Sequence, residues 1–464
     1  MKMKILMQAG LLILLTAGMY FKVEGGNDRT SPRLVGMARA NTAVAWGVDA
    51  AGINPALLSV NRWSSVEVNI LRAGFLFGSN FMDSDLYSTY FTGVDDPVTE
   101  ERVAKHLTPD DKNKILNSFP NGTGKINTDA QVAWFGAAVR TNMYGAVAFT
   151  VSDRFSMNFT MPNDYMRLLL EGFSEFGSMY DFSGTDAQSW WIREYSFSYA
   201  TPKFRDIGFL QWITFGVGLK RVSGYVYFGT ESYEGYISNE DLDGGFVLSG
   251  SVNMNVRRAS ANFIHDPDAY EFSPVGDPAG SGWGFDAGIA AGITENIIAG
   301  LSITDIGSIR WTENTYGTTA DASVEIDDIF SEEQRDSLEN AYTGTDETIA
   351  PFSTSMPAAI RAGISWQKSN NLLIAADYTQ GLNTMPANTT TPRFAVGVEW
   401  KLIRYLPLRS GMSVGGYAGF AWSLGFGLHL GFFNLEVATE NIGLLLYPNK
   451  TKHASVTVGT NFRF

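Results

Sequence analysis

The sequence predicts an all-β fold: a transmembrane antiparallel β-barrel of about 14 strands, with an N-terminal hatch in the lumen and short helices in long loops. Three observations predict it. Glycine accounts for 48 of the 464 residues and aromatic residues for 13%, whereas charged residues reach only 18%. Apolar residues alternate with small or polar residues in many short segments. After the N-terminus, no continuous apolar run is long enough to cross a bilayer as a helix, so a membrane-embedded chain has to be a barrel.

The charge and the cysteine content exclude several classes of function. The chain has 34 basic and 48 acidic residues, a net charge of −14, so it offers no basic field for nucleic acid. It has no cysteine, which excludes a disulfide framework, cysteine-ligated metals, thiol catalysis and a lipid-modified N-terminal cysteine. Low charge with abundant glycine and aromatic residues also argues against a coiled coil or a disordered chain.

Residues 1–26 are predicted to be a signal peptide. Lys2 and Lys4 precede an apolar run over residues 5–21, and small residues follow it, as in secretory signals. The alternative is a membrane-anchoring helix, but no strong basic stop-transfer cluster follows the run. We therefore expect export and residence in the bacterial outer membrane.

Residues 27–62 do not alternate, and we expect them to form a hatch that precedes the barrel of residues 63–464. Small side chains dominate residues 36–51, which lets backbone pack closely against backbone. Asn54 and Pro55 form a turn signal, and Pro55 suits the first position of a short helix. A segment of small residues that comes before a barrel is a natural plug for its lumen.

The barrel strands are predicted from a period of two, with apolar residues on the lipid side and small or polar residues on the lumen side. The clearest segments are residues 191–199, 213–220, 285–292, 358–367, 393–401, 425–431 and 455–464. Weaker strands are expected elsewhere, including residues 225–230 and 246–254. The last strand ends on Phe464, which resembles the C-terminal signature of bacterial outer-membrane barrels.

A large soluble β-sandwich or propeller would also alternate. Glycine and serine on the inner face, and tryptophans near strand ends as in an interfacial girdle, favour the barrel. These tryptophans are Trp190, Trp191, Trp212, Trp283, Trp366 and Trp400.

Three long connections are predicted to contain helices. Thr108 can cap a helix in which Pro109 takes the first position and Asp111 complements the helix dipole. Residues 163–176 place apolar side chains at helical spacing, and residues 327–342 contain a capping-box pattern.

The residues of the hatch resemble a known family. The pattern runs Gly-Met-Ala-Arg-Ala from Gly36, Asp-Ala from Asp49 and Asn-Pro-Ala-Leu-Leu from Asn54. It resembles the N-terminal hatch of the FadL-type outer-membrane barrels, a superfamily that includes long-chain fatty-acid and aromatic-hydrocarbon channels and PorV-type components of the type IX secretion system. Residues 107–116 and 308–311 are similar to an uncharacterised branch found in the Bacteroidota.

The resemblance implies a fourteen-stranded barrel whose hatch fills the lumen. Ligand-binding residues of the family do not carry over, because no loop of this chain matches them. The hatch residues that the resemblance implies are Gly36, Ala38, Asp49, Asn54, Pro55 and Ala56.

Motifs that suggest catalysis or metal binding are few. Residues 411–415 match Gly-x-Ser-x-Gly, but in a glycine-rich strand, so a lumen-facing serine explains them. Asn239, Asp241 and Asp243 match the opening of a calcium loop, although Gly250 stands where a bidentate glutamate is needed. A solvated acidic turn is the alternative. We expect no enzyme, no cofactor and no metal site beyond this candidate loop.

Two functions fit these predictions. The first is passive uptake of small hydrophobic molecules through a hatch-gated barrel, with the molecule bound in the lumen and outer-membrane lipid around the wall. The alternative is an interaction role, as a PorV-like component or shuttle of the type IX secretion system, with a secreted or secretion-system protein bound at the long loops. No nucleic-acid partner is expected.

Overall fold

The computed structural model describes residues 29–60, 65–95, 102–141, 143–173, 177–242, 245–265, 276–326, 344–403, 405–416 and 419–464. The predicted signal peptide and the helix expected over residues 327–342 lie outside this part of the chain. Within it, no helix is long and apolar enough to cross a membrane.

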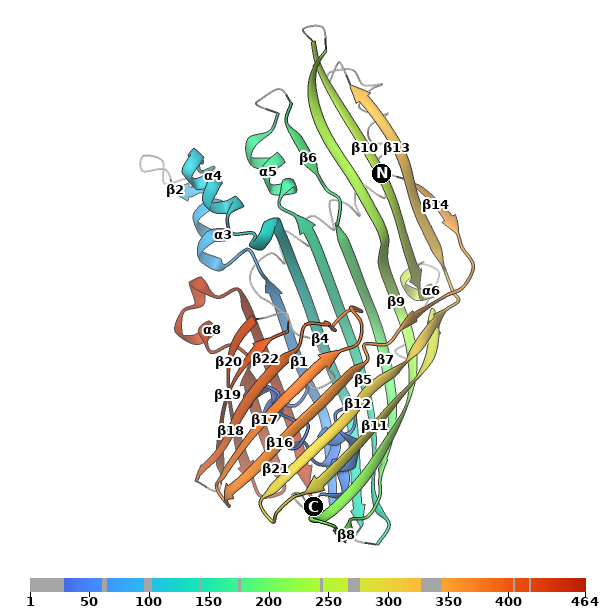
Figure 1. The fold of residues 1–464 in the computed structure, drawn as a ribbon, viewed down its shortest axis with the longest axis vertical. Coiled ribbons are helices and arrows are strands. Elements are labelled where there is room, and N and C mark those ends of the chain that lie inside the picture. The colour runs from blue at the N-terminus through green and yellow to red at the C-terminus, as the bar shows by residue number, and fades with distance from the viewer. Residues whose placement is uncertain are drawn as a thin grey trace.

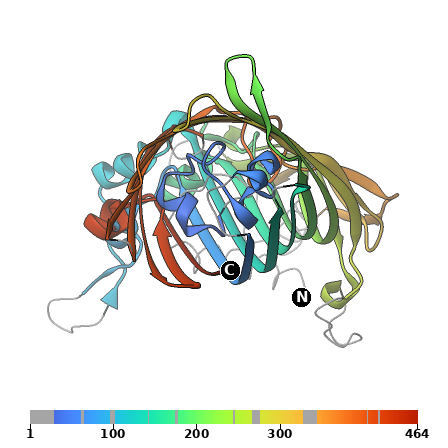
Figure 2. The ribbon, with the colours of Figure 1, turned by 90° about the horizontal axis from the view of Figure 1, so that it is seen from below.

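Fourteen antiparallel strands form a closed ring (Figures 1 and 2), in which each strand pairs with the next in the series and the last pairs with the first. The series is β1 (Val66–Ser79), β4 (Thr123–Thr141), β5 (Gly145–Pro162), β7 (Asp186–Ala200), β9 (Leu210–Leu242), β11 (Gly280–Gly292), β12 (Ile297–Trp311), β16 (Ala359–Ser369), β17 (Leu372–Gly381), β18 (Arg393–Ile403), β19 (Leu406–Gly415), β20 (Gly419–Leu430), β21 (Phe433–Thr439) and β22 (His453–Arg463). The predicted fold class and strand number are confirmed.

The two faces of the wall differ as the alternation predicted. On β18, Phe394, Val396 and Trp400 face outward and are about half exposed, whereas Ala395 and Glu399 are buried on the inner face. An apolar outer face on a closed antiparallel ring is the architecture with which proteins cross bacterial outer membranes. The chain is an outer-membrane barrel.

Not all of the tryptophans expected at the lipid interfaces lie there. Trp283, Trp366 and Trp400 face outward, but Trp190 and Trp212 are buried. Trp190 lies on the inward face of β7, and Trp212 on that of β9. The parity of a residue along the strand, rather than its distance from the strand end, decides which face it takes.

One side of the barrel rises well above the ring (Figure 1). There β9 is 33 residues long, and its second half pairs with β10 (Gly245–Ser260). β10 then pairs with β13 (Tyr316–Ile326), and β13 with β14 (Thr345–Thr348). The segments predicted as separate strands over 225–230 and 246–254 therefore belong to this extension, the first as a continuation of β9.

Helices lie mainly in the long connections, at the opposite end from the tight turns (Figure 1). Helix α4 (Pro109–Leu116) has the predicted cap: the Thr108 side chain accepts from the Asp111 N–H, and the Asp111 side chain accepts from the Thr108 N–H. The helix predicted over 163–176 is α5 (Asp164–Glu171). The remaining short elements outside the barrel lumen are β2 (Val94–Asp95), β3 (Arg102–Val103), β6 (Met179–Asp181), β8 (Phe204–Ile207), β15 (Phe352–Ser355), α3 (Ser84–Tyr90), α6 (Asn262–His265), α8 (Gly443–Leu446), η3 (Pro120–Gly122) and η4 (Pro448–Lys450).

Candidate functional site

Residues 29–60, called the plug below, lie inside the ring of strands, as the dark blue segment of Figure 2 shows. The plug contains α2 (Pro32–Gly36), η1 (Gly47–Ala50) and η2 (Pro55–Ser59), and nearly all of its residues are buried. Helix α2 packs against β20 and β21, η1 against β4, and η2 against β9 and β11. The boundaries predicted for the hatch and the barrel, 27–62 and 63–464, stay predictions.

A belt of wall glycines surrounds the plug. A Cβ at any of them would lie 3.2 Å or less from a plug atom. At Gly216 it would be 2.1 Å from the Ala56 nitrogen, and at Gly397 it would be 2.4 Å from the Met37 oxygen. The belt, named the glycine belt below, consists of Gly74, Gly136, Gly216, Gly288, Gly300, Gly363, Gly397, Gly411, Gly425 and Gly459. The high glycine content therefore serves close backbone approach between the wall and the plug.

Three of the predicted hatch residues form one joint between the plug and the wall. The Asn54 Nδ2 donates to the carbonyl oxygens of Thr42 and Ile289, each at 3.1 Å, and its Oδ1 accepts from the Ala56 N–H at 3.2 Å. Asn54 is thus the cap of η2, whose first residue is Pro55. Since Ile289 belongs to β11, a single side chain ties two plug segments to the wall.

The other three predicted hatch residues lie at separate contacts. Gly36 packs against Gly425 of β20. Ala38 has a left-handed backbone with φ 52°, and its carbonyl accepts from the guanidinium of Arg393. Asp49 forms an ion pair with Arg72 of β1 at 2.8 Å. All six predicted residues therefore lie in the plug, but they do not converge on one site.

The sequence reasoning missed a set of buried ion pairs that hold the plug. Arg33 Nε donates to Glu399 Oε2 at 2.8 Å, and Arg409 Nε reaches the same oxygen at 2.8 Å. Arg409 continues the chain of contacts to Glu436 at 2.7 Å, and the Arg33 guanidinium lies 3.7 Å from the ring centroid of Trp46. Charged residues at inward strand positions were the available signal, because an unpaired charge is rarely left buried.

Further carboxylates bind the plug at Arg29, where it begins, and at Asn41 and Thr42, near its middle. Arg29 forms ion pairs with Asp129 of β4 and with Glu440, the second at 3.1 Å. Asp377 of β17 accepts from the backbone N–H groups of Asn41 and Thr42, at 2.5 and 2.6 Å. The plug is therefore anchored by charge on several sides of the ring.

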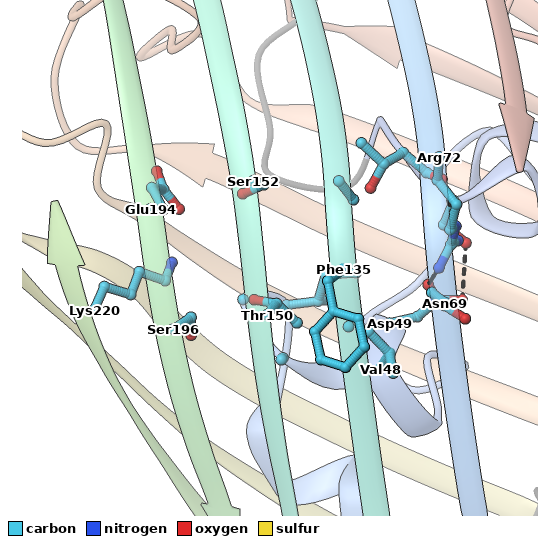
Figure 3. A pocket seen from close by; sticks show the side chains of 17 residues that line it. Val48, Asp49, Asn69, Arg72, Phe135, Thr150, Ser152, Glu194, Ser196 and Lys220 are labelled. Carbon is cyan, nitrogen blue, oxygen red and sulfur yellow. Dashed lines mark hydrogen bonds and ion pairs between the residues drawn. The ribbon is translucent and has the colours of Figure 1, made fainter. Parts of the chain in front are cut away.

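A small cavity of about 70 Å³ lies between the plug and the wall (Figure 3). Asp49 and Val48 line it from the plug, and Asn69, Glu194 and Lys220 line it from the wall. The lining is predominantly polar, and the oxygen Oε1 of Glu194 has no hydrogen-bond partner among the described residues.

Lys220 is surrounded by acids on the inner wall. It forms ion pairs with Asp286 at 3.0 Å and with Asp305. Asp305 sits at a β-bulge of β12 with φ 58°, which turns its carboxylate toward Lys220. The wall beside the cavity thus combines one buried lysine with more than one buried carboxylate.

The wall is irregular next to the cavity. Ile70 and Leu71 of β1 are consecutive and both exposed on the outer face, and Leu71 has φ 48°. On β4, the consecutive residues Trp134 and Phe135 are also both exposed. The pairing of β1 with β4 skips Leu71, and its pairing with β22 is interrupted over the same stretch. Two neighbouring strands therefore bulge where Phe135 borders the cavity.

Beyond Lys220, toward the long loops, the inner wall becomes aromatic. Trp190, Tyr227, Trp311 and Phe352 are buried together, and are called the aromatic cluster below. The ring centroid of Tyr227 lies 5.4 Å from that of Trp311 and 5.5 Å from that of Phe352. Along the barrel axis from the long-loop end, the aromatic cluster thus comes before the polar cavity and the plug.

The candidate calcium loop stays a prediction, because only part of it lies among the described residues. Asn239 lies in β9, and its Oδ1 accepts from the Ser178 N–H at 2.7 Å. Asp241 also lies in β9, and Asp243 is outside the described residues. Among those described, no three His, Asp or Glu side chains are grouped so that they could hold a metal. Ser413 of the Gly-x-Ser-x-Gly match is buried on β19.

Comparison with known proteins identifies the family. Residues 55–440 match the sequence model of a family described as "Family of unknown function (DUF5723)". The chain belongs to the DUF5723 family. No curated protein is significantly similar in sequence to this DUF5723 chain.

Solved structures similar to the DUF5723 chain include two toluene transporters and a FadL homologue. The toluene transporter TbuX of Ralstonia pickettii is 13% identical, with a TM-score of 0.48 over 94% of this chain and 99% of the other. A FadL homologue of Pseudomonas aeruginosa is 12% identical, with a TM-score of 0.46 over 96% and 100%. The toluene transporter TodX of P. putida is 12% identical, with a TM-score of 0.45 over 92% and 98%.

The descriptions of these structures name toluene transporters and a FadL homologue, and FadL-type barrels are the family that the plug residues resemble. Membership of a Bacteroidota branch stays a prediction, as does the expectation that the DUF5723 chain is not an enzyme. The alternative role in a type IX secretion system gains no support from the comparisons.

Proposed function

We propose that this DUF5723 protein mediates passive uptake of small hydrophobic molecules through a barrel that the plug gates. The observation that carries the proposal is the position of the plug, which lies across the lumen between the aromatic cluster and the end with the tight turns. A solute that enters from the long-loop end meets the aromatic cluster first and the plug afterwards.

The aromatic cluster is the apolar region that such a solute meets, and because its rings are packed together and buried, they have to separate to bind it. Aromatic and aliphatic side chains bind such molecules by removing apolar area from water, at roughly 25 cal/mol per Å². Trp311 also carries a fixed orientation, because its Nε1 donates to Thr354 Oγ1 at 2.9 Å.

Passage beyond the cluster requires a change at the plug or at the wall. The glycine belt leaves little free space between the two, and the cavity of about 70 Å³ is too small for a hydrocarbon of several carbon atoms. The irregular pairing of β1 lies beside the cavity. A shift of η1 there would join the cavity to the outer face of the wall.

A disulfide between the plug and the wall tests this gating. A Cβ at Gly136 of β4 would lie 3.6 Å from the Cβ of Val48 in η1, within the range of about 3.5–4.5 Å that disulfides require. Because the chain has no native cysteine, Val48→Cys with Gly136→Cys introduces the only thiols. We expect oxidised double-variant barrels in liposomes to lose uptake of oleate and toluene, and reduction to restore it.

The single variants Val48→Cys and Gly136→Cys are the matched controls, since they change the same sites without forming the bond. Their uptake is expected to be the same under oxidising and reducing conditions. Undiminished uptake by fully oxidised double-variant barrels would refute plug gating. If liposomes that contain the wild-type barrel take up neither oleate nor toluene faster than protein-free liposomes, the proposed uptake function is wrong.

A further inference from the structure

An apolar cleft of about 720 Å³ opens on the outer surface of the barrel, where α8 leaves the end of β21. Phe420 and Trp422 of β20 form one side, and Ile442, Leu446 and Tyr447 form the other. Figure 2 shows α8 outside the ring of strands, away from the plug. The cleft is thus separate from the lumen and from the site of the proposed uptake.

The cleft lies at the outer boundary of the lipid-facing band. On β20, outward apolar residues run from Phe420 at the long-loop end to Leu430 at the tight-turn end. Ten residue steps at about 3.3 Å, on a strand tilted by about 40°, span about 25 Å along the membrane normal, which is the height of the apolar band in such barrels. Phe420 therefore marks the upper limit of the acyl region, and α8 lies just above it.

The apolar side chains of α8 are held in an exposed position. Leu445, Leu446 and Tyr447 are 65%, 55% and 68% exposed. The loop is fixed by hydrogen bonds: the Ile442 N–H donates to the Trp422 oxygen at 2.7 Å, and further bonds link the start of the loop to β22. Three adjacent apolar residues on a fixed loop at this height favour contact with lipid.

Lysines stand at the upper edge of the cleft. Lys450 is exposed, and Lys452 is half-buried with its Nζ donating to the Asn80 oxygen at 3.1 Å. An ammonium has three N–H donors, so Lys452 keeps donors for a second acceptor. No aspartate or glutamate lines the cleft among the described residues, although the chain carries a net charge of −14. The charge of the cleft is therefore complementary to an anion.

We propose that this cleft binds a phosphorylated, acylated glycolipid of the outer leaflet. Its acyl chains lie along Phe420, Trp422 and Leu446, and a phosphate of its headgroup binds Lys450 and Lys452. The arrangement matches the ligand in order: apolar surface within the acyl region, and cationic groups above it at headgroup level. Such barrels have their longer loops on the extracellular side, so the outer leaflet is at the long-loop end, where α8 and the cleft that it lines are located.

The test is native mass spectrometry of the detergent-solubilised barrel titrated with bis-phosphorylated lipid A. Lys450→Glu is expected to weaken binding roughly tenfold or more, because it reverses one charge at the phosphate. Lys114→Glu, an equal charge change on the exposed surface of α4, is the matched control and should bind as the wild type does. A heat-modifiable shift on gels verifies that each variant is folded.

Two comparison ligands identify the chemistry. Dephosphorylated lipid A should bind at least roughly tenfold more weakly than the bis-phosphorylated form, and Lys450→Glu should not weaken it further. Unchanged binding by Lys450→Glu, or equal binding of the dephosphorylated ligand, would overturn the proposal. Equal affinity for phosphatidylglycerol would assign the cleft to anionic lipid in general rather than to the glycolipid, and a protein that copurifies on α8 and excludes lipid would also overturn it.

Discussion

Removing the charge of Glu399 tests whether buried ion pairs hold the plug in the barrel. Glu399 lies on β18 and accepts from Arg33 of the plug and from Arg409 of the wall. The substitution Glu399→Gln keeps the shape of the side chain and removes its charge. Arg409 retains the Glu436 carboxylate as a partner. Among the described residues, Arg33 retains no carboxylate partner and keeps neutral ones: the Val44 oxygen, the face of Trp46 and the amide oxygen of the new glutamine.

The magnitude follows from the burial of the pair. The side chains of Arg33 and Glu399 are 1% and 4% exposed, so solvent screens their interaction little. Breaking a buried ion pair by removing one partner costs about 3–5 kcal/mol. At about 1.4 kcal/mol per factor of ten, the population of barrels with an undocked plug should rise roughly 100- to 4,000-fold.

Hydrogen exchange of peptides from residues 29–60 measures this population, because exchange reports the free energy of local opening. The matched control is Glu231→Gln, which breaks an ion pair with Arg257 that is about one-third exposed and should leave plug exchange unchanged. An acceleration of less than about tenfold at residues 29–60, in a variant that still forms a folded barrel, would show that the ion pairs do not anchor the plug.

Three other changes test the packing and the capping. Gly216→Val should reduce the yield of folded barrel, because even the first carbon of the side chain would lie 2.1 Å from plug backbone; a heat-modifiable gel shift at wild-type yield would contradict this. Asn54→Ala should destabilise the plug by roughly 3 kcal/mol, since three hydrogen bonds of about 1 kcal/mol each are lost, and equal exchange rates in the plug would refute it. Hydrogen bonds from the hydroxyl and N–H of Thr108 lower the pKa of Asp111 below its ordinary value of 3.8. This interaction therefore stabilises α4 above that value and is lost as the pH falls through the lower folded pKa, so exchange protection of α4 should fall below about pH 4 in the wild type and not in Asp111→Asn.

The ring was predictable from sequence because each strand carries its own signal. Phe394, Val396 and Trp400 alternate with inward residues in sequence just as they do in space. The helix at residues 109–116 was predictable for the same reason, since Thr108 and Asp111 form a local cap. Where neighbouring residues determine the structure, pattern and propensity were sufficient.

The contacts that hold the plug were not predictable, because they join residues far apart in the chain. Arg33 and Glu399 are 366 positions apart, and the sequence around either residue does not indicate that the other is its partner. The bulge that presents Asp305 to Lys220 is equally hidden, since it depends on a left-handed residue within an otherwise regular strand. The length of β9 was not predicted correctly, because its alternation continues beyond the residues that belong to the ring.

The fit between the glycine belt and the plug also has a consequence for biogenesis. Wall and plug meet so tightly at Gly216, Gly288 and Gly397 that a methyl group would collide with the opposing chain. A finished cylinder therefore leaves no clearance for the plug to be threaded in from either mouth. The N-terminal segment is therefore expected to take its place while the sheet is still open, before the pairing of β1 with β22 joins the first and last strands of the cylinder.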